Sequence, residues 1–256
     1  MATIPAQIEM TAQLANKQHW QSLGRSYSAA WEPPAKRALS RRELGFIATQ
    51  LRRTPARFAL DVGVGNGRIL AGLLSVTQST RFYGIDLAEE MVSVCRERLR
   101  DQSRIEQLLV ADIDQLQLPI ECDFDFISAI RVLTYNERWR EIVGYLVGRL
   151  RPGGVLVFSM PNRNSLNRIS RPYAIPWHSA SRAQLQALLT QVGAQIIDSA
   201  GFVRLPHRLY DETRKSSLAR LVTGADAILE RLLPKELLAR ELFIAATPST
   251  PPSSPT

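Results

Sequence analysis

Three glycines at alternate positions follow an acidic residue in the segment 58–68. Asp61 comes two residues before Gly63, and Gly65 and Gly67 complete a GxGxG pattern behind an apolar run. Glycine adopts positive φ easily, and it lets a ligand lie against backbone that a Cβ would cover. A strand, a tight loop and a helix N-terminus in this order are typical of a site for a nucleotide-like ligand.

Two more acidic residues come where later strands are expected to end. Asp86 follows the apolar segment 82–85, and a carboxylate there can accept hydrogen bonds from both hydroxyls of a ribose. Asp112 follows 108–111, where it can accept a hydrogen bond from an exocyclic amine. A dinucleotide site would need the third glycine one residue later and a second mononucleotide-binding half, and the sequence shows neither.

Alternating strands and helices are needed to bring these residues together. Five segments have the apolar character and flanking turns of strands: 58–63, 81–86, 106–111, 124–130 and 154–160. Three helical stretches lie between them: 67–76, 88–101 and 136–150. Such alternation predicts a parallel sheet with crossover helices on both of its faces.

Helices and strands are also expected on either side of this region. Apolar spacing predicts a helix over 39–53, with Ser40 as the candidate N-cap and Glu43 three residues later. Further on, Ser181 opens an amphipathic helix that ends at Gly193. The remaining elements are two strands and a largely helical insert between them: 194–203, 240–246 and about 207–238.

The length of 256 residues fits one large α/β domain with appendages. We expect that domain over 39–246, a helical or irregular substrate-side extension over 1–38, and a disordered Pro/Ser/Thr-rich tail over 247–256. No apolar run reaches the roughly 20 residues that span a bilayer, and the N-terminus lacks the features of a signal peptide. The cytoplasm is therefore the expected location. Cys95 and Cys122 form no CxxC pair, so neither a disulfide nor a metal site is expected.

In combination, these motifs resemble those of class I S-adenosylmethionine-dependent methyltransferases, over about residues 39–203. The resemblance implies an α/β fold with a doubly wound, mostly parallel, seven-stranded Rossmann-like sheet and helices on both faces. It also implies that S-adenosylmethionine lies with its methionine part over the glycine loop, its amino group at Asp61, its ribose at Asp86 and its adenine amine at Asp112. Three apolar residues would pack on the adenine faces: Leu87, Met91 and Ile113. Acids suit this cofactor, which carries an ammonium group and no phosphate.

Methyl transfer is a direct displacement at the sulfonium carbon, so the protein mainly aligns donor and acceptor and excludes water. An oxygen acceptor usually also needs a base, whereas a neutral amine does not. His178 is the candidate base, because its place between segment 161–166 and Ser181 is loosely similar to the ubiquinone-biosynthesis O-methyltransferase branch. A surface loop histidine is the alternative reading, and His19 and His207 are weaker candidates. The ligand acids of a metal site cannot be placed, so no metal is predicted.

Segment 130–135 follows the fourth predicted strand, and in the resembling family it borders the transferred methyl group. Arg131 and Tyr135 are the candidate catalytic residues in it. The Arg131 guanidinium either binds an anionic group of the acceptor or pairs with a helix acid such as Glu137.

The chain has a net charge of +8, but its arginines are spread over the whole length. The Asn-Pro-Pro-Tyr signature of nucleic-acid amino methylation is absent after the fourth strand, so nucleic acid is a disfavoured partner. We expect a methyl group to pass to an oxygen or nitrogen of a small-molecule biosynthetic intermediate, lipidic or glycosidic in class. An rRNA or tRNA methyltransferase and a non-catalytic cofactor-binding scaffold are the alternatives.

The insert 207–238 combines an apolar face with nearby basic residues. A lid over an apolar acceptor, contact with an anionic membrane surface and a homodimer face are three roles that this pattern allows. Packing on the domain's own core is the fourth.

Overall fold

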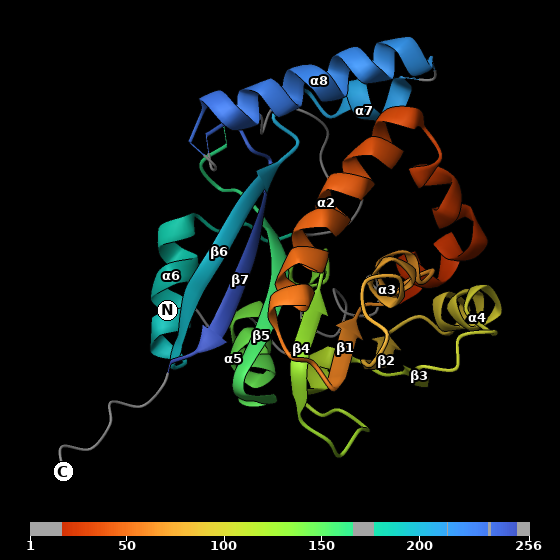
Figure 1. Ribbon diagram of the computed structural model, residues 1–256, viewed down its shortest axis with the longest axis vertical. Helices are drawn as coiled ribbons and strands as arrows, with labels where there is room; N and C mark the ends of the chain where they lie inside the picture. The colour runs from red at the N-terminus through yellow and green to blue at the C-terminus, as the bar shows by residue number, and fades with distance from the viewer. Residues whose placement is uncertain (1–16, 166–176, 214, 235–236, 250–256) are drawn as a thin grey trace.

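The computed structural model describes residues 17–165, 177–213, 215–234 and 237–249, and its centre is a seven-stranded sheet (Figure 1). Its strands are β1 Phe58–Val62, β2 Arg81–Asp86, β3 Ile105–Val110, β4 Phe124–Ala129, β5 Leu150–Pro161, β6 Ala194–Phe202 and β7 Glu241–Pro248. They lie in the order β3-β2-β1-β4-β5-β7-β6. β1 to β5 are parallel, and β7 runs antiparallel to both of its neighbours. The predicted doubly wound, mostly parallel sheet is thereby confirmed.

Helices cover both faces of this sheet, each over its own hydrophobic core (Figure 1). One face carries α2 (Pro34–Arg53), α3 (Arg68–Leu74) and α4 (Glu89–Arg98), and the other carries α5 (Trp139–Gly148) and α6 (Arg182–Gln191). Successive residues of β1 point to opposite cores, Ala59 to the first and Leu60 to the second. Strands buried in this way on both faces need the continuous apolar runs that marked them in the sequence.

The helix before β1 begins earlier than the sequence predicted. α2 starts at Pro34. The proline ring fixes a φ that suits the first turn of a helix, and the N–H that proline lacks would have no intrahelical hydrogen-bond partner at this position. Ser40 is therefore no N-cap: it lies inside the helix, and its Oγ accepts a hydrogen bond from Arg68 at 2.7 Å. Glu43, expected as its capping partner, is fully buried.

The bounds of the other helices and strands differ less from those predicted. Ser181 caps α6 through a capping box with Gln184, as expected. β5 begins at Leu150 and not at 154, because Leu150 pairs with Phe124 ahead of a shift in register. The insert forms α7 (Arg208–Glu212) and α8 (Ser216–Leu232), so its helical character is confirmed where it is described.

The expected tail at 247–256 is partly strand, since β7 continues to Pro248; 250–256 lie outside the described residues, as do 1–16 of the extension. Among the described helices, none has both the length and the apolar character that crossing a membrane requires.

The strand order reverses between β1 and β4. β2 and β3 lie on one side of this point and β5 on the other, so the loops after β1 and β4 separate at the carboxyl edge of the sheet. A crevice at such a switch point is where open α/β sheets bind their ligands.

Candidate functional site

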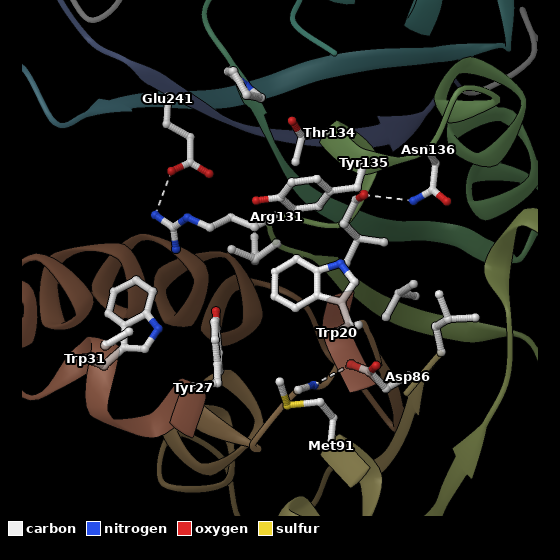
Figure 2. Close-up of a pocket in the computed structure, with 18 of the residues that line it drawn as sticks. Trp20, Tyr27, Trp31, Asp86, Met91, Arg131, Thr134, Tyr135, Asn136 and Glu241 are labelled. Carbon is white, nitrogen blue, oxygen red and sulfur yellow. Dashed lines mark hydrogen bonds and ion pairs between the residues drawn. The ribbon is translucent and has the colours of Figure 1, made fainter. Parts of the chain in front are cut away.

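A cavity of about 390 Å³ opens at this switch point. The carboxyl ends of β1 to β5 form its floor, and residues from the helical segment 17–23, the 3₁₀ segment Gly24–Trp31, α2 and α7 form its walls. Figure 2 shows side chains from these elements converging on one space. The cavity has two ends, one near the glycine loop and one near α7.

The glycine-loop end is built around Asp86. Its Oδ2 accepts a hydrogen bond from the Gly65 N–H at 2.8 Å (Figure 2), and its Oδ1 accepts one from the Ala88 N–H at 2.9 Å. Burial raises the pKa of Asp86, although these two backbone donors oppose the shift. The turn itself needs glycine: Gly63 has a φ of +69°, and a Cβ on it would lie 2.2 Å from Cγ2 of Val132.

Asp61 lies directly before this turn and is 2% exposed. Its Oδ1 accepts a hydrogen bond from Ser128 at 2.7 Å, while its Oδ2 has no hydrogen-bond partner among the described residues. Burial raises the pKa of Asp61 to about 7. A buried carboxylate oxygen without a donor is costly, and an ammonium group beside it would remove that cost.

The other predicted cofactor residues divide between cavity wall and support. Asp112, Leu87, Met91 and Ile113 line the cavity, as do Gly63, Gly65 and Asp86. Asp61 and Gly67 are not among the described lining residues; Gly67 is the N-cap of α3 with a φ of +76°. This donor set fits S-adenosylmethionine, with acids for its ammonium, ribose and adenine amine and apolar side chains for the adenine faces.

Gly63→Ala is expected to destabilise the protein and to weaken S-adenosylmethionine binding. The positive φ alone costs roughly 1–2 kcal/mol for alanine, and displacing Val132 adds about 1–3 kcal/mol. Gly153→Ala is the matched control, because Gly153 also has positive φ (+76°) but its Cβ would meet no described heavy atom within 4 Å. Urea unfolding and calorimetric titration should show a smaller loss of stability and no loss of affinity for the control. Equal effects of the two changes would contradict the assigned role of Gly63.

Aromatic side chains cover the space between the two ends. The Trp20 ring lies edge-on to Tyr135 at 5.1 Å and to Tyr27 at 5.9 Å between ring centroids. Figure 2 shows the Tyr135 hydroxyl directed toward the Arg131 side of the cavity. Trp31 continues this wall, with the Arg68 guanidinium 3.8 Å and the Arg131 guanidinium 5.0 Å from its ring centroid.

Arg131 pairs with acids other than the one suggested by the sequence. Its Nη2 is 2.5 Å from Oε1 of Glu43 and 2.6 Å from Oε2 of Glu241, so Glu137 is not its partner in this structure. Burial lowers the pKa of Arg131, but Glu241 and Glu43 outweigh it and raise that pKa well above its ordinary value. Ser159 joins the network, accepting from the Arg131 N–H and donating to Glu241. Because its guanidinium is paired with two carboxylates, Arg131 is held in place as part of the cavity wall.

The α7 end of the cavity holds a histidine oriented by an acid. His207 Nδ1 lies 2.5 Å from Oδ2 of Asp211, and Lys36 Nζ lies 2.9 Å from Oδ1 of the same carboxylate. Lys36 is also 3.1 Å from His207 Nε2. Because an ammonium group can only donate, Nε2 is the accepting nitrogen and Nδ1 carries the proton.

The pKa values of this group follow from its burial and pairing. Burial lowers the pKa of His207, against the opposing effect of Asp211. Burial alone would raise the pKa of Asp211, but hydrogen bonds from His207 and Lys36 lower it to about 2. The arrangement is therefore a neutral imidazole with a lone pair on Nε2, held beside a cation.

His178 lies elsewhere. Its backbone N–H donates to the Thr134 carbonyl at 2.7 Å, and its side chain is not among the described residues that line the cavity. Its role as a base stays a prediction. Sequence reasoning did not connect His207 with Asp211, which the structure pairs at the cavity. The signal available was their spacing, four residues apart and thus on one side of a helix.

Comparisons with known proteins agree with this geometry. Residues 60–158 match the family described as "Methyltransferase domain". The ubiquinone biosynthesis O-methyltransferase of Idiomarina loihiensis is 28% identical over 121 residues, 47% of this chain and 49% of that enzyme, so the chain spans about half the length of this relative. The trans-aconitate 2-methyltransferase of Variovorax paradoxus is 28% identical over 83% of this chain and 86% of that enzyme.

A solved structure shows the same fold. The magnesium protoporphyrin IX methyltransferase of Synechocystis PCC 6803, crystallised with bound S-adenosylhomocysteine, superposes with a TM-score of 0.65 at 12% identity, over 93% of this chain and all of that one. The motif residues, the strand order and the sequence matches all agree. Residues 60–158 belong to the methyltransferase-domain family, and the chain has the class I S-adenosylmethionine-dependent methyltransferase fold.

Proposed function

We propose that this protein transfers a methyl group from S-adenosylmethionine to an oxygen or nitrogen atom of a small molecule, and that oxygen is the favoured atom. One observation carries the proposal: a single cavity joins the acids of the glycine-loop end to His207 at the other end. Its volume of about 390 Å³ lies in the range of small-molecule sites.

The residues of the site divide the work. Asp61, Asp86 and Asp112 would hold the cofactor, which supplies a methyl group already activated on a sulfonium sulfur. An acceptor hydroxyl that replaces Lys36 on Nε2 of His207 would give its proton to that nitrogen. Its oxygen would bond to the methyl carbon, and the electron pair of the broken S–C bond would remain on sulfur. The Lys36 ammonium group would stabilise negative charge on the oxygen.

The walls of the cavity favour a lipidic acceptor. Apolar side chains from three elements or their adjoining loops line the cavity, Leu39, Ile130 and Val203 among them, beside the aromatic wall. The two relatives named above are a ubiquinone biosynthesis O-methyltransferase and a trans-aconitate 2-methyltransferase, names that refer to small molecules and not to RNA. This supports a small acceptor over rRNA or tRNA.

Tritium transfer tests the proposal directly. The protein is incubated with methyl-tritiated S-adenosylmethionine and an extract of the source cells, which is then separated into lipid, water-soluble and RNA fractions. We expect label in the lipid fraction, and much less label with Asp86→Ala when the cofactor is well below saturation. Label in the RNA fraction, or no transfer by a protein that binds the cofactor, would contradict the proposal.

His207→Gln is expected to lower kcat by about 10²- to 10⁴-fold and to leave the Kd for S-adenosylmethionine unchanged. Because the base must be neutral and burial lowers its pKa, wild-type activity should rise with pH below 6.5 and be flat above it. His178→Gln is the matched control and should retain turnover. Loss of turnover in His178→Gln with full activity in His207→Gln would reverse the assignment.

A further inference from the structure

Helix α8 carries an apolar stripe that faces away from the protein. Its members are spaced three and four residues apart, so they lie along one side of the helix: Leu218, Leu221, Ala225, Ile228 and Leu232. The large side chains among them are 48%, 69%, 57% and 74% exposed, in that order. Burial in the domain core, one of the roles open for this segment, therefore does not account for this side of α8.

The opposite side of α8 packs on the domain. Ala219, Val222 and Asp226 are buried there, and α8 lies across the end of α2 nearest α7 (Figure 1). Arg42 of α2 forms ion pairs with both Asp226 and Glu230. The inner side of α8 therefore packs against the domain, and Arg42 neutralises the two carboxylates of the helix.

This pairing leaves the outer side of α8 with one sign of charge. Asp226 and Glu230 are the two acids of the helix, and both are engaged by Arg42. Arg220 and Arg231 are exposed, as is Lys215 directly before the helix. The surface presented outward is therefore apolar and cationic, in a chain whose net charge is +8.

We propose that α8 lies in the surface of an anionic membrane, with the stripe at the boundary of headgroups and acyl chains. Apolar side chains flanked by basic ones are what a helix needs to lie in that plane, and anionic lipids attract arginine and lysine near the surface. A second copy of this chain would bring the same arginines against each other, which favours the membrane as the occupant.

The position of α8 would link membrane docking to the cavity. α7 directly precedes α8, and His207 and Asp211 at α7 line the acceptor end of the cavity. Docking of α8 would hold that end near lipid acceptors. This consequence depends on the proposed function, whereas the docking does not.

Vesicle co-sedimentation tests the docking. The full chain is mixed with vesicles of phosphatidylcholine alone or of equal parts phosphatidylcholine and phosphatidylglycerol. We expect binding to the second kind only, weakened by salt. The double variant Leu221→Glu with Leu232→Glu should bind at least about 10-fold more weakly, since it replaces two apolar side chains of the stripe with carboxylates that an anionic surface repels. Ile197→Glu on β6, where isoleucine is 48% exposed, is the matched control and should bind normally.

Three outcomes would overturn the docking: no binding to anionic vesicles, equal binding by the double variant, or a dimer in analytical ultracentrifugation that the double variant abolishes. The last would assign the stripe to a second copy. Calorimetric titration with S-adenosylmethionine should give the same Kd for every variant. Failure of docking with intact cofactor binding therefore leaves the proposed methyl transfer standing, and loss of cofactor binding alone leaves docking standing.

Discussion

Glu43→Ala should lower the free energy of unfolding by about 3–5 kcal/mol, the usual cost of removing one partner from a buried ion pair. Glu43 is fully buried, with Arg131 at 2.5 Å from one carboxylate oxygen and Arg68 at 3.5 Å from the other. Its removal leaves Arg68 without an ion-pair partner among the described residues and leaves Arg131 with Glu241. The large loss is expected because the Glu43 side chain is fully buried, so water has little access to the place of its carboxylate.

The matched control is Glu141→Ala. Glu141 also pairs with an arginine, Arg138, but both side chains are largely exposed, so the expected loss is below about 1 kcal/mol. Urea unfolding measures both changes, and Glu43→Gln, which keeps the shape of the side chain, serves if the alanine variant does not fold. Equal losses for Glu43 and Glu141 would show that the buried network adds nothing to stability.

The effect of Glu43 should also depend on pH. Burial alone would raise the pKa of Glu43, but Arg131 and Arg68 outweigh it and lower that pKa below its ordinary value. An acid with a lowered folded pKa stabilises the protein above its unfolded pKa, and this contribution is lost as the pH falls through the folded value. The difference between wild type and Glu43→Ala should therefore be full at neutral pH and shrink only in acid.

Asp86→Ala should weaken S-adenosylmethionine binding by roughly 10- to 150-fold, the equivalent of the 1.5–3 kcal/mol of a hydrogen bond to a charged group. The carboxylate is the candidate partner of the ribose hydroxyls, and it also holds the Gly65 N–H at 2.8 Å, which shapes the glycine turn. Both effects act in the same direction. Isothermal titration calorimetry measures the change without knowledge of the acceptor.

Asp101→Ala is the control for this experiment, because Asp101 is an acid of the surface, with its side chain 85% exposed. It should leave the affinity unchanged. Thermal unfolding of Asp86→Ala separates a lost ligand contact from a lost fold. An unchanged Kd for a folded Asp86→Ala protein would refute the placement of the cofactor.

The sheet and the residues at the glycine-loop end of the cavity were predictable because their signals are local. A strand, a glycine turn and an acid lie within a few residues of one another, and each keeps its meaning without knowledge of the rest of the chain. The sequence predicted in this way that Asp86 and Asp112 would share one site, and both line the same cavity, since strand ends of a parallel sheet meet at one edge.

The α7 end of the cavity and the Arg131 network were not predictable in the same way, because their contacts join distant segments. Arg131 meets Glu43 and Glu241, which are 88 and 110 residues away in the chain, so a nearby acid such as Glu137 was the natural guess. His207 gains its partner Lys36 from 171 residues away. Ser40 had the residue type of an N-cap, but Pro34 could begin the helix earlier, and packing against Arg68 fixed the outcome.

The lone oxygen of Asp61 has a consequence for proton balance. Because burial raises its pKa to about 7, this carboxyl group titrates near neutral pH in the ligand-free protein. A cation held against it favours the ionised form, so binding and deprotonation are thermodynamically linked. We therefore expect uptake of a positively charged ligand beside Asp61 to release protons to the buffer, and its affinity to increase as the pH rises through 7. The glycine-loop end of the cavity would thereby couple binding to proton release.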